Sequence, residues 1–141
     1  MVLLSEDVRK KLQKEFEDLS GKVKLMVFTQ EFECAHCREN TSLAQEVASL
    51  SDKLDIEIYN FALDKEVVER YGVDKIPAIV VEGEKDYGVR FYGVPAGYEF
   101  TTLIEAIKAV SAGESGLAAK TKEALRGLKD PLHLQVFVTP T

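Results

Sequence analysis

Both cysteines of this 141-residue chain lie in one short stretch, residues 32–38 (FECAHCR), and this stretch constrains the fold more than any other feature. It follows an apolar run, residues 23–29, and precedes residues 43–50, where apolar side chains recur at helical spacing. A spacing of three at the start of a helix puts Cys34 and Cys37 on one side of it, with Cα atoms roughly 5–6 Å apart, within disulfide range. The sequence therefore predicts a strand, a turn carrying two cysteines and a helix in direct succession.

The position of the cysteines at a helix start assigns them different expected roles. A helix N-terminus has unpaired N–H groups and a partial positive charge, which stabilise a thiolate and lower the pKa of a cysteine placed there. We therefore expect Cys34 to be the nucleophile that attacks a target disulfide and Cys37 to be the thiol that resolves the mixed disulfide.

The two residues between the cysteines, Ala35 and His36, are the expected redox-tuning positions. A protonated His36 adds positive charge beside the sulfur of Cys34 and stabilises the reduced form. Three nearby glutamates oppose this effect, but exposed carboxylates are screened by salt. The prediction is a more oxidising couple than that of a motif with Gly-Pro between its cysteines.

Other interpretations of the cysteine pair stay open at this point. A purely structural disulfide would close so small a loop that it stabilises the fold by only about 2 kcal/mol. A zinc site needs four ligands, and beyond the cysteines the chain offers only His36 and His133. An iron–sulfur cluster would need two cysteines from each of two chains. The pair could also be inert, on a unit that serves as a scaffold.

Composition limits the class of protein. The chain is 45% apolar and 30% charged, as in soluble globular proteins, and its length fits one domain with some residues to spare. Its net charge of −6 argues against nucleic-acid binding. We expect neither a membrane span nor a signal peptide, and hence a cytoplasmic protein, where a Cys-x-x-Cys pair is more often redox-active or metal-binding than structural. The charged fraction also suits a thermophile.

Periodicity predicts an order of elements along the chain. Strands are expected over residues 22–29, 54–60, 73–81 and 88–93, and helices over 6–19, from the cysteines to about 53, over 64–71, through 100–110 and over 117–128. Ser5 and Asp64 are expected to cap the first and third of these helices. The order β-α-β-α-β-β-α behind an N-terminal helix predicts an α/β fold, a mixed sheet with helices on both faces.

Pro77, directly after Ile76, is the second predicted site element. Proline cannot donate to a ladder and therefore belongs at the head or edge of a strand. A cis Ile76–Pro77 bond would turn the backbone of Ile76 outward, where an extended substrate peptide can pair with it. A Cys-x-x-Cys turn, a β-α unit and then a proline that heads a hairpin are arranged as in thioredoxin-fold proteins.

Four stretches resemble a known family, the glutaredoxin-like protein disulfide oxidoreductases of hyperthermophilic archaea and bacteria, which carry two thioredoxin-fold units in tandem. They are residues 34–37 (CAHC), 71–77 (YGVDKIP), 86–100 (DYGVRFYGVPAGYEF, the most distinctive) and 136–141 (VFVTPT). The resemblance implies a cytoplasmic thiol:disulfide oxidoreductase of broad range that acts on protein dithiols and disulfides and is reduced by a thioredoxin-reductase-like flavoenzyme. We expect no cofactor beyond the Cys34–Cys37 disulfide itself.

The chain departs from thioredoxin at two positions near the cysteines. Glu33 stands before Cys34, where thioredoxins carry Trp. Phe28 stands six residues before Cys34, where thioredoxins carry a buried acid. Proton transfer from Cys37 must therefore use another group or water.

The end of the chain resembles its beginning. Residues 132–141 are similar to residues 22–29, and a Val-Phe pair stands in each. Self-similarity at a distance indicates a repeat. We therefore predict a thioredoxin-like (glutaredoxin-like) unit over residues 1–112, and over 113–141 a connecting helix and the first strand of a second unit that is otherwise missing. The alternatives are a fifth strand of a single domain and, for function, a redox-slow scaffold unit that supports a second, catalytic unit.

Overall fold

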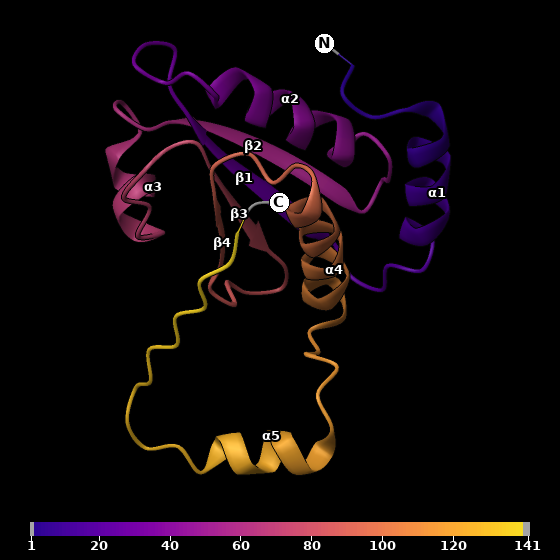
Figure 1. Ribbon diagram of the computed structural model, residues 1–141, viewed down its shortest axis with the longest axis vertical. Helices are drawn as coiled ribbons and strands as arrows, with labels where there is room; N and C mark the ends of the chain where they lie inside the picture. Colours follow the sequence, from indigo (N-terminus) through magenta and orange to yellow (C-terminus); the bar gives the residue numbers. More distant parts are fainter. Residues whose placement is uncertain (1, 140–141) are drawn as a thin grey trace.

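The computed structural model describes residues 2–139 and contains a four-stranded sheet with helices on both faces (Figure 1). The helices are α1 (Glu6–Phe16), α2 (Cys37–Ala48), α3 (Lys65–Arg70), α4 (Tyr98–Ala112) and α5 (Ala119–Arg126), and the strands are β1 (Val23–Thr29), β2 (Leu54–Asn60), β3 (Ala78–Glu82) and β4 (Val89–Tyr92). The strand order is β2-β1-β3-β4, in which β1 and β2 are parallel and the other pairs antiparallel. This is the mixed sheet and the order of elements that the sequence predicts.

Strand β1 lies at the centre of the molecule because β2 and β3 flank it and helices cover both of its faces. Leu25 and Val27 enter a core shared with α1, α2 and α4. Met26 and Phe28 enter a second core on the side of α3. All four side chains are at most 1% exposed. A strand that is buried on both faces reads as a continuous apolar run rather than an alternating one.

Several element boundaries differ from the sequence-based expectation. The side chain of Ser5 accepts the backbone N–H of Val8 and caps α1 as expected, at 3.3 Å. The carboxylate of Asp64 instead accepts the N–H of Asn60, at 2.6 Å, so it closes the loop before α3 and does not cap the helix. Strand β3 is shorter than predicted, since residues 73–77 form a turn and a loop that leads into it.

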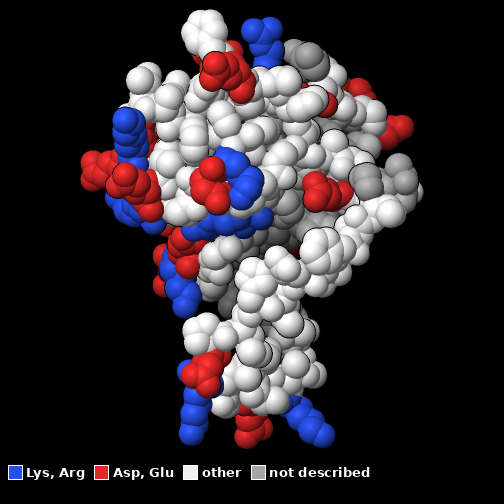
Figure 2. Space-filling model, turned by 60° about the vertical axis from the view of Figure 1, so that its left-hand side comes forward, with Lys and Arg blue, Asp and Glu red and all other residues white. Residues whose placement is uncertain are grey.

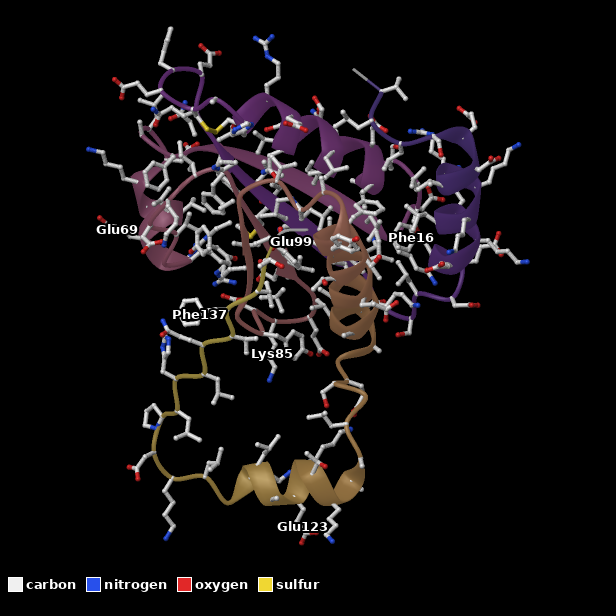
Figure 3. All side chains as sticks on the ribbon, in the orientation of Figure 1. Phe16, Glu69, Lys85, Glu99, Glu123 and Phe137 are labelled. Atoms are coloured by element: carbon white, nitrogen blue, oxygen red, sulfur yellow. A yellow bond between two sulfur atoms is a disulfide. The ribbon has the colours of Figure 1, made fainter. Side chains whose placement is uncertain are left out.

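The C-terminal part of the chain leaves the packed body after α4 (Figure 1). Helix α5 forms as predicted, but none of its residues is buried. The strand predicted over 132–141 is wrong for residues 132–139, which contain no strand; Pro140 and Thr141 lie outside the described residues. A strand needs a neighbour for its backbone N–H and C=O groups, and this segment pairs with none of the four strands. In Figure 3, Phe16 lies within the body and Phe137 on the extended segment.

The surface carries charges of both signs. Figure 2 shows basic and acidic side chains interspersed over the body and at the α5 end, without a large area of one sign on the face in view. Within residues 2–139, no helix is long and apolar enough to cross a lipid bilayer.

Candidate active site

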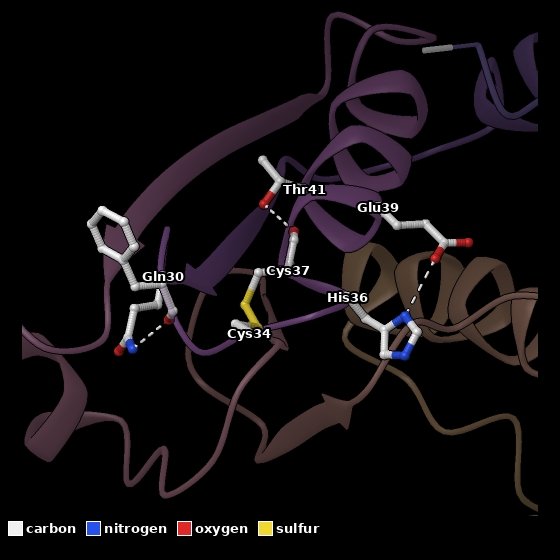
Figure 4. Close-up of a disulfide and its surroundings, with 7 residues drawn as sticks. Gln30, Cys34, His36, Cys37, Glu39 and Thr41 are labelled. Carbon is white, nitrogen blue, oxygen red and sulfur yellow. Dashed lines mark hydrogen bonds and ion pairs between the residues drawn. A yellow bond between two sulfur atoms is a disulfide. The ribbon is translucent and has the colours of Figure 1, made fainter.

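The two cysteines lie where β1 gives way to α2, and their sulfur atoms form a disulfide (Figure 4). The Cα atoms are 5.5 Å apart, as expected for the spacing. Cys34 is partly exposed, whereas Cys37 is only 1% exposed. Of the two cysteines, Cys34 is thus the one that a second molecule can reach.

Helix α2 begins at Cys37, so Cys34 lies in the turn in front of it. The expectation that both cysteines share the first helical turn is therefore correct for Cys37 alone. His36 is the residue that precedes the helix, and its carbonyl accepts the N–H of Asn40 at 3.0 Å. Cys34 still lies at the positive end of the helix dipole, which acts over the first turn.

The loop before Cys34 has a tight, specific conformation. The side chain of Gln30 donates to the carbonyl of Phe32 at 2.7 Å (Figure 4). Glu33 follows with φ of 57°, the left-handed region that non-glycine residues rarely adopt. This geometry turns the chain sharply from the end of β1 into the cysteine turn and leaves the ring of Phe32 77% exposed.

His36 faces away from the disulfide and towards Glu39. Its Nδ1 atom lies 3.7 Å from Oε2 of Glu39, and Figure 4 shows the imidazole directed to that carboxylate. Both side chains are well exposed, 70% and 47%, so solvent and salt screen the pair. The positive charge expected from His36 is therefore partly balanced at its source by Glu39.

Ile76 and Pro77 reach the same edge of the sheet as the cysteines. The bond between them is cis, as expected. Phe28 near the end of β1 pairs with Ala78 at the start of β3, so Pro77 lies beside the point where the chain leaves β1 for the cysteine turn. The carbonyl of Pro77 accepts the N–H of Gly93 at 2.9 Å. Pro77 is buried and Ile76 partly exposed.

A groove of about 1030 Å³ opens beside Cys34 on the side of β2. Its walls come from the loop before Cys34, from α2 through Arg38 and Gln45, and from the end of β2 through Ile58 and Asn60. The sequence analysis missed these residues because they come from three separate elements. The signal that was available is an apolar ring, Phe32, beside the motif in an otherwise charged loop.

A second missed residue is buried. Asn40 lies one turn after Cys37 on α2, is 0% exposed, and neither its amide nitrogen nor its amide oxygen has a hydrogen-bond partner. It occupies the apolar stripe of α2, between Cys37 and Leu43. The signal was a polar residue at a core position of the helical pattern. Phe28, in contrast, is fully buried and stacks on Tyr59 with ring centroids 5.5 Å apart.

The resolved pKa shifts nearest the cysteines belong to β2. The hydroxyl of Tyr59 donates to Glu57, which lowers the pKa of that carboxyl and raises the pKa of the phenol. Lys24 pairs with the same carboxylate at 2.9 Å and its pKa is raised. This network ties β1 to β2 rather than reaching the sulfur atoms. Among residues 2–139, no three His, Cys, Asp or Glu side chains gather closely enough to hold a metal ion.

Comparisons with known proteins agree with this geometry. Residues 22–105 match the family model described as thioredoxin domain. A probable thioredoxin of Methanothermobacter marburgensis is 35% identical over 86 residues, which are 60% of this chain and 92% of that protein. The structure of a protein disulfide oxidoreductase from Aeropyrum pernix K1 superposes with a TM-score of 0.81 at 30% identity, over 92% of this chain and 57% of the other.

One group of relatives is much longer than this chain. The alkyl hydroperoxide reductase AhpF of Staphylococcus epidermidis is 28% identical over 145 residues, which are 99% of this chain but 25% of that protein. The chain thus spans about a quarter of this relative's length and little more than half of the Aeropyrum protein.

Proposed function

Because this chain belongs to the thioredoxin domain family, we propose that it is a thiol:disulfide oxidoreductase unit that reduces, forms or isomerises protein disulfides through Cys34 and Cys37. The observation that carries the proposal is the pairing of an accessible Cys34 with a buried Cys37 at one edge of the sheet. An accessible sulfur suits attack on a substrate, and a sheltered one suits intramolecular resolution.

In the reductive direction, the Cys34 thiolate attacks one sulfur of a substrate disulfide and displaces the other as a thiolate. The mixed disulfide is then broken by the Cys37 thiolate, which attacks the sulfur of Cys34 and releases the second substrate thiolate. Two electrons pass to the substrate, and the Cys34–Cys37 disulfide is left. The substrate backbone would lie along Ile76 and Pro77, at the same edge of the sheet.

The remaining parts of the proposal concern partners and location. The similarity to the alkyl hydroperoxide reductase AhpF supports a place in a redox chain with a reductase unit, and a thioredoxin-reductase-like flavoenzyme is the partner we propose. A second thioredoxin-like unit, begun by residues 113–141, would cover the exposed apolar side chains of that segment. We propose the cytoplasm as its location and no cofactor beyond the disulfide.

Insulin-disulfide reduction tests the proposed chemistry. The parent chain, recycled by dithiothreitol, should accelerate the precipitation of insulin chains, and Cys34→Ser should fall to the uncatalysed rate. Equal rates for parent and Cys34→Ser would favour the alternative, a redox-slow scaffold unit whose chemistry belongs to another domain. The reduction potential of the Cys34–Cys37 couple, measured against glutathione, then decides between oxidant, isomerase-like and reductant roles. His36→Pro should lower that potential.

A further inference from the structure

Asn40 is a buried polar group that the fold does not explain. Its side chain is 0% exposed, and both of its amide heavy atoms are without a hydrogen-bond partner while Cys34 and Cys37 are joined. An unpaired buried amide costs about 1–3 kcal/mol, and an apolar residue of similar volume would avoid that cost. Its neighbours on the α2 stripe, Leu43, Ala44 and Val47, show that the surroundings accept apolar side chains.

The amide is directed towards Cys37. Residues three apart on a helix have Cβ atoms about 5–6 Å apart on one face. Helical side chains lean towards the N-terminus, so the Asn40 amide leans back towards the turn that begins with Cys37. Cys37 is itself 1% exposed, and its carbonyl is already engaged by the hydroxyl of Thr41 at 2.9 Å. When the disulfide opens, the Cys37 sulfur becomes a buried group that needs a donor.

Resting on the proposed function, we propose that Asn40 is a positioning residue for the resolving step, in which its Nδ2–H donates a hydrogen bond to the sulfur of Cys37. Cys37 gives up its proton, and its thiolate attacks the Cys34 sulfur of the mixed disulfide. The Cys34–Cys37 bond forms, the bond to the substrate breaks, and the departing substrate thiolate takes the proton. Asn40 thus supplies the polar contact that Phe28, at the position of the thioredoxin acid, does not.

The experiment separates attack from resolution in the full chain. Reduced protein is mixed with 5,5′-dithiobis(2-nitrobenzoate), and release of nitrothiobenzoate is followed by stopped-flow absorbance across a pH series. Attack by Cys34 releases the first anion at a rate that depends on reagent concentration. Resolution by Cys37 releases the second anion at a rate that does not. A parent without the second phase would overturn the proposed function and this inference together.

For Asn40→Leu we expect the second phase to slow about tenfold at neutral pH and its pH midpoint to rise, because a hydrogen bond to a charged sulfur is lost. The first phase should stay within about twofold, and thermal stability should not fall. Leu43→Ala is the matched control: it removes a side chain from the same stripe, lowers stability and leaves the pH midpoint unchanged. If Asn40→Leu does not fold, Asn40→Ala takes its place. A second phase with parent rate and midpoint in the Asn40 variant would overturn the inference while the proposed function stands.

Discussion

Two segments of this chain have similar sequences and opposite environments. Strand β1, Val23–Thr29, and residues 132–138 are both rich in Val, Leu and Phe, and each carries a Val-Phe pair. Phe28 in β1 is 0% exposed, whereas Phe137 in the C-terminal segment is 89% exposed. The first is a paired central strand, and the second has no strand structure at all in the part of the chain that the structure describes.

The difference shows that a strand pattern defines a capacity rather than a state. β1 has β2 and β3 on its two edges and helices on its two faces, so its backbone groups and its side chains are both satisfied. The C-terminal segment follows α5, which lies apart from the sheet (Figure 1). Without neighbours on its edges, the same pattern stays extended and solvated.

The largest expected effect comes from truncating the two matched phenylalanines. Phe28→Ala should lower the free energy of unfolding by about 3–5 kcal/mol, because it leaves a cavity against Tyr59. Phe137→Ala should change it by less than about 0.5 kcal/mol. Urea unfolding followed by circular dichroism measures both. Comparable losses for the two variants would mean that the C-terminal segment is packed in solution.

A smaller effect is expected from one ion pair in each region. Arg90 donates two hydrogen bonds to Asp86, at 2.8 and 2.6 Å, and also bonds the carbonyl of Tyr71, so the pair ties β4 to the end of α3. This contact lowers the pKa of Asp86. Glu114 pairs with Lys122 in the exposed connecting segment, which also lowers the pKa of that carboxyl.

Asp86→Asn should therefore destabilise the protein by about 1 kcal/mol at pH 7, the scale of a partly exposed charged hydrogen bond. Because the folded-state pKa is lowered, this stabilisation is present above the ordinary Asp pKa and is lost as the pH falls through the folded-state pKa. The difference from the parent should thus vanish in strong acid. Glu114→Gln is the control, with no measurable change at either pH; a pH-independent deficit in Asp86→Asn would contradict the account.

The redox centre that follows β1 distinguishes it further from the C-terminal segment. Glu39→Gln removes the carboxylate beside His36 and leaves less negative charge near the Cys34 thiolate, so the reduced form is stabilised. The reduction potential should rise by about 5–20 mV, the equivalent of one exposed ion pair. Equilibration with glutathione measures it, and Glu31→Gln serves as a control in the same loop region. A lowered potential would show that Glu39 acts by some route other than charge.

The smallest expected effect is that of removing the whole C-terminal region. Termination after Ser115 keeps the turn that ends α4, where the N–H of Glu114 bonds the carbonyl of Ala109 at 3.2 Å. Since α5 buries no residue, the free energy of unfolding should stay within about 0.5 kcal/mol of the parent. Insulin reduction should also be retained. Loss of either property would show that this region supports the thioredoxin-like unit.

Much of the site could be predicted because it depends on local spacing. Cys34 and Cys37 lie three residues apart at a helix start, so their Cα separation follows from chain geometry. Pro77 heads a strand, and the alternation of elements places it beside the end of β1. The roles proposed for Ala35, His36 and Ile76 remain predictions.

Other parts of the site depend on contacts between distant elements or on the direction of one side chain. The groove beside Cys34 joins α2 to the end of β2, which no local pattern relates. His36 turns to Glu39, one of two or more directions that its exposed side chain could take. Asn40 became notable only when its burial without a partner was known.

The sequence by itself determined the order of the elements, the continuous apolar run of β1 and the redox pair at the start of α2, because each depends on residues close together in the chain. Only the tertiary structure decided which apolar segments became strands. Val23–Thr29 gained partners on both edges, whereas residues 132–138 gained none among the strands described. Strand formation is a non-local event: its hydrogen bonds join residues far apart in the chain, so an apolar pattern alone cannot specify it.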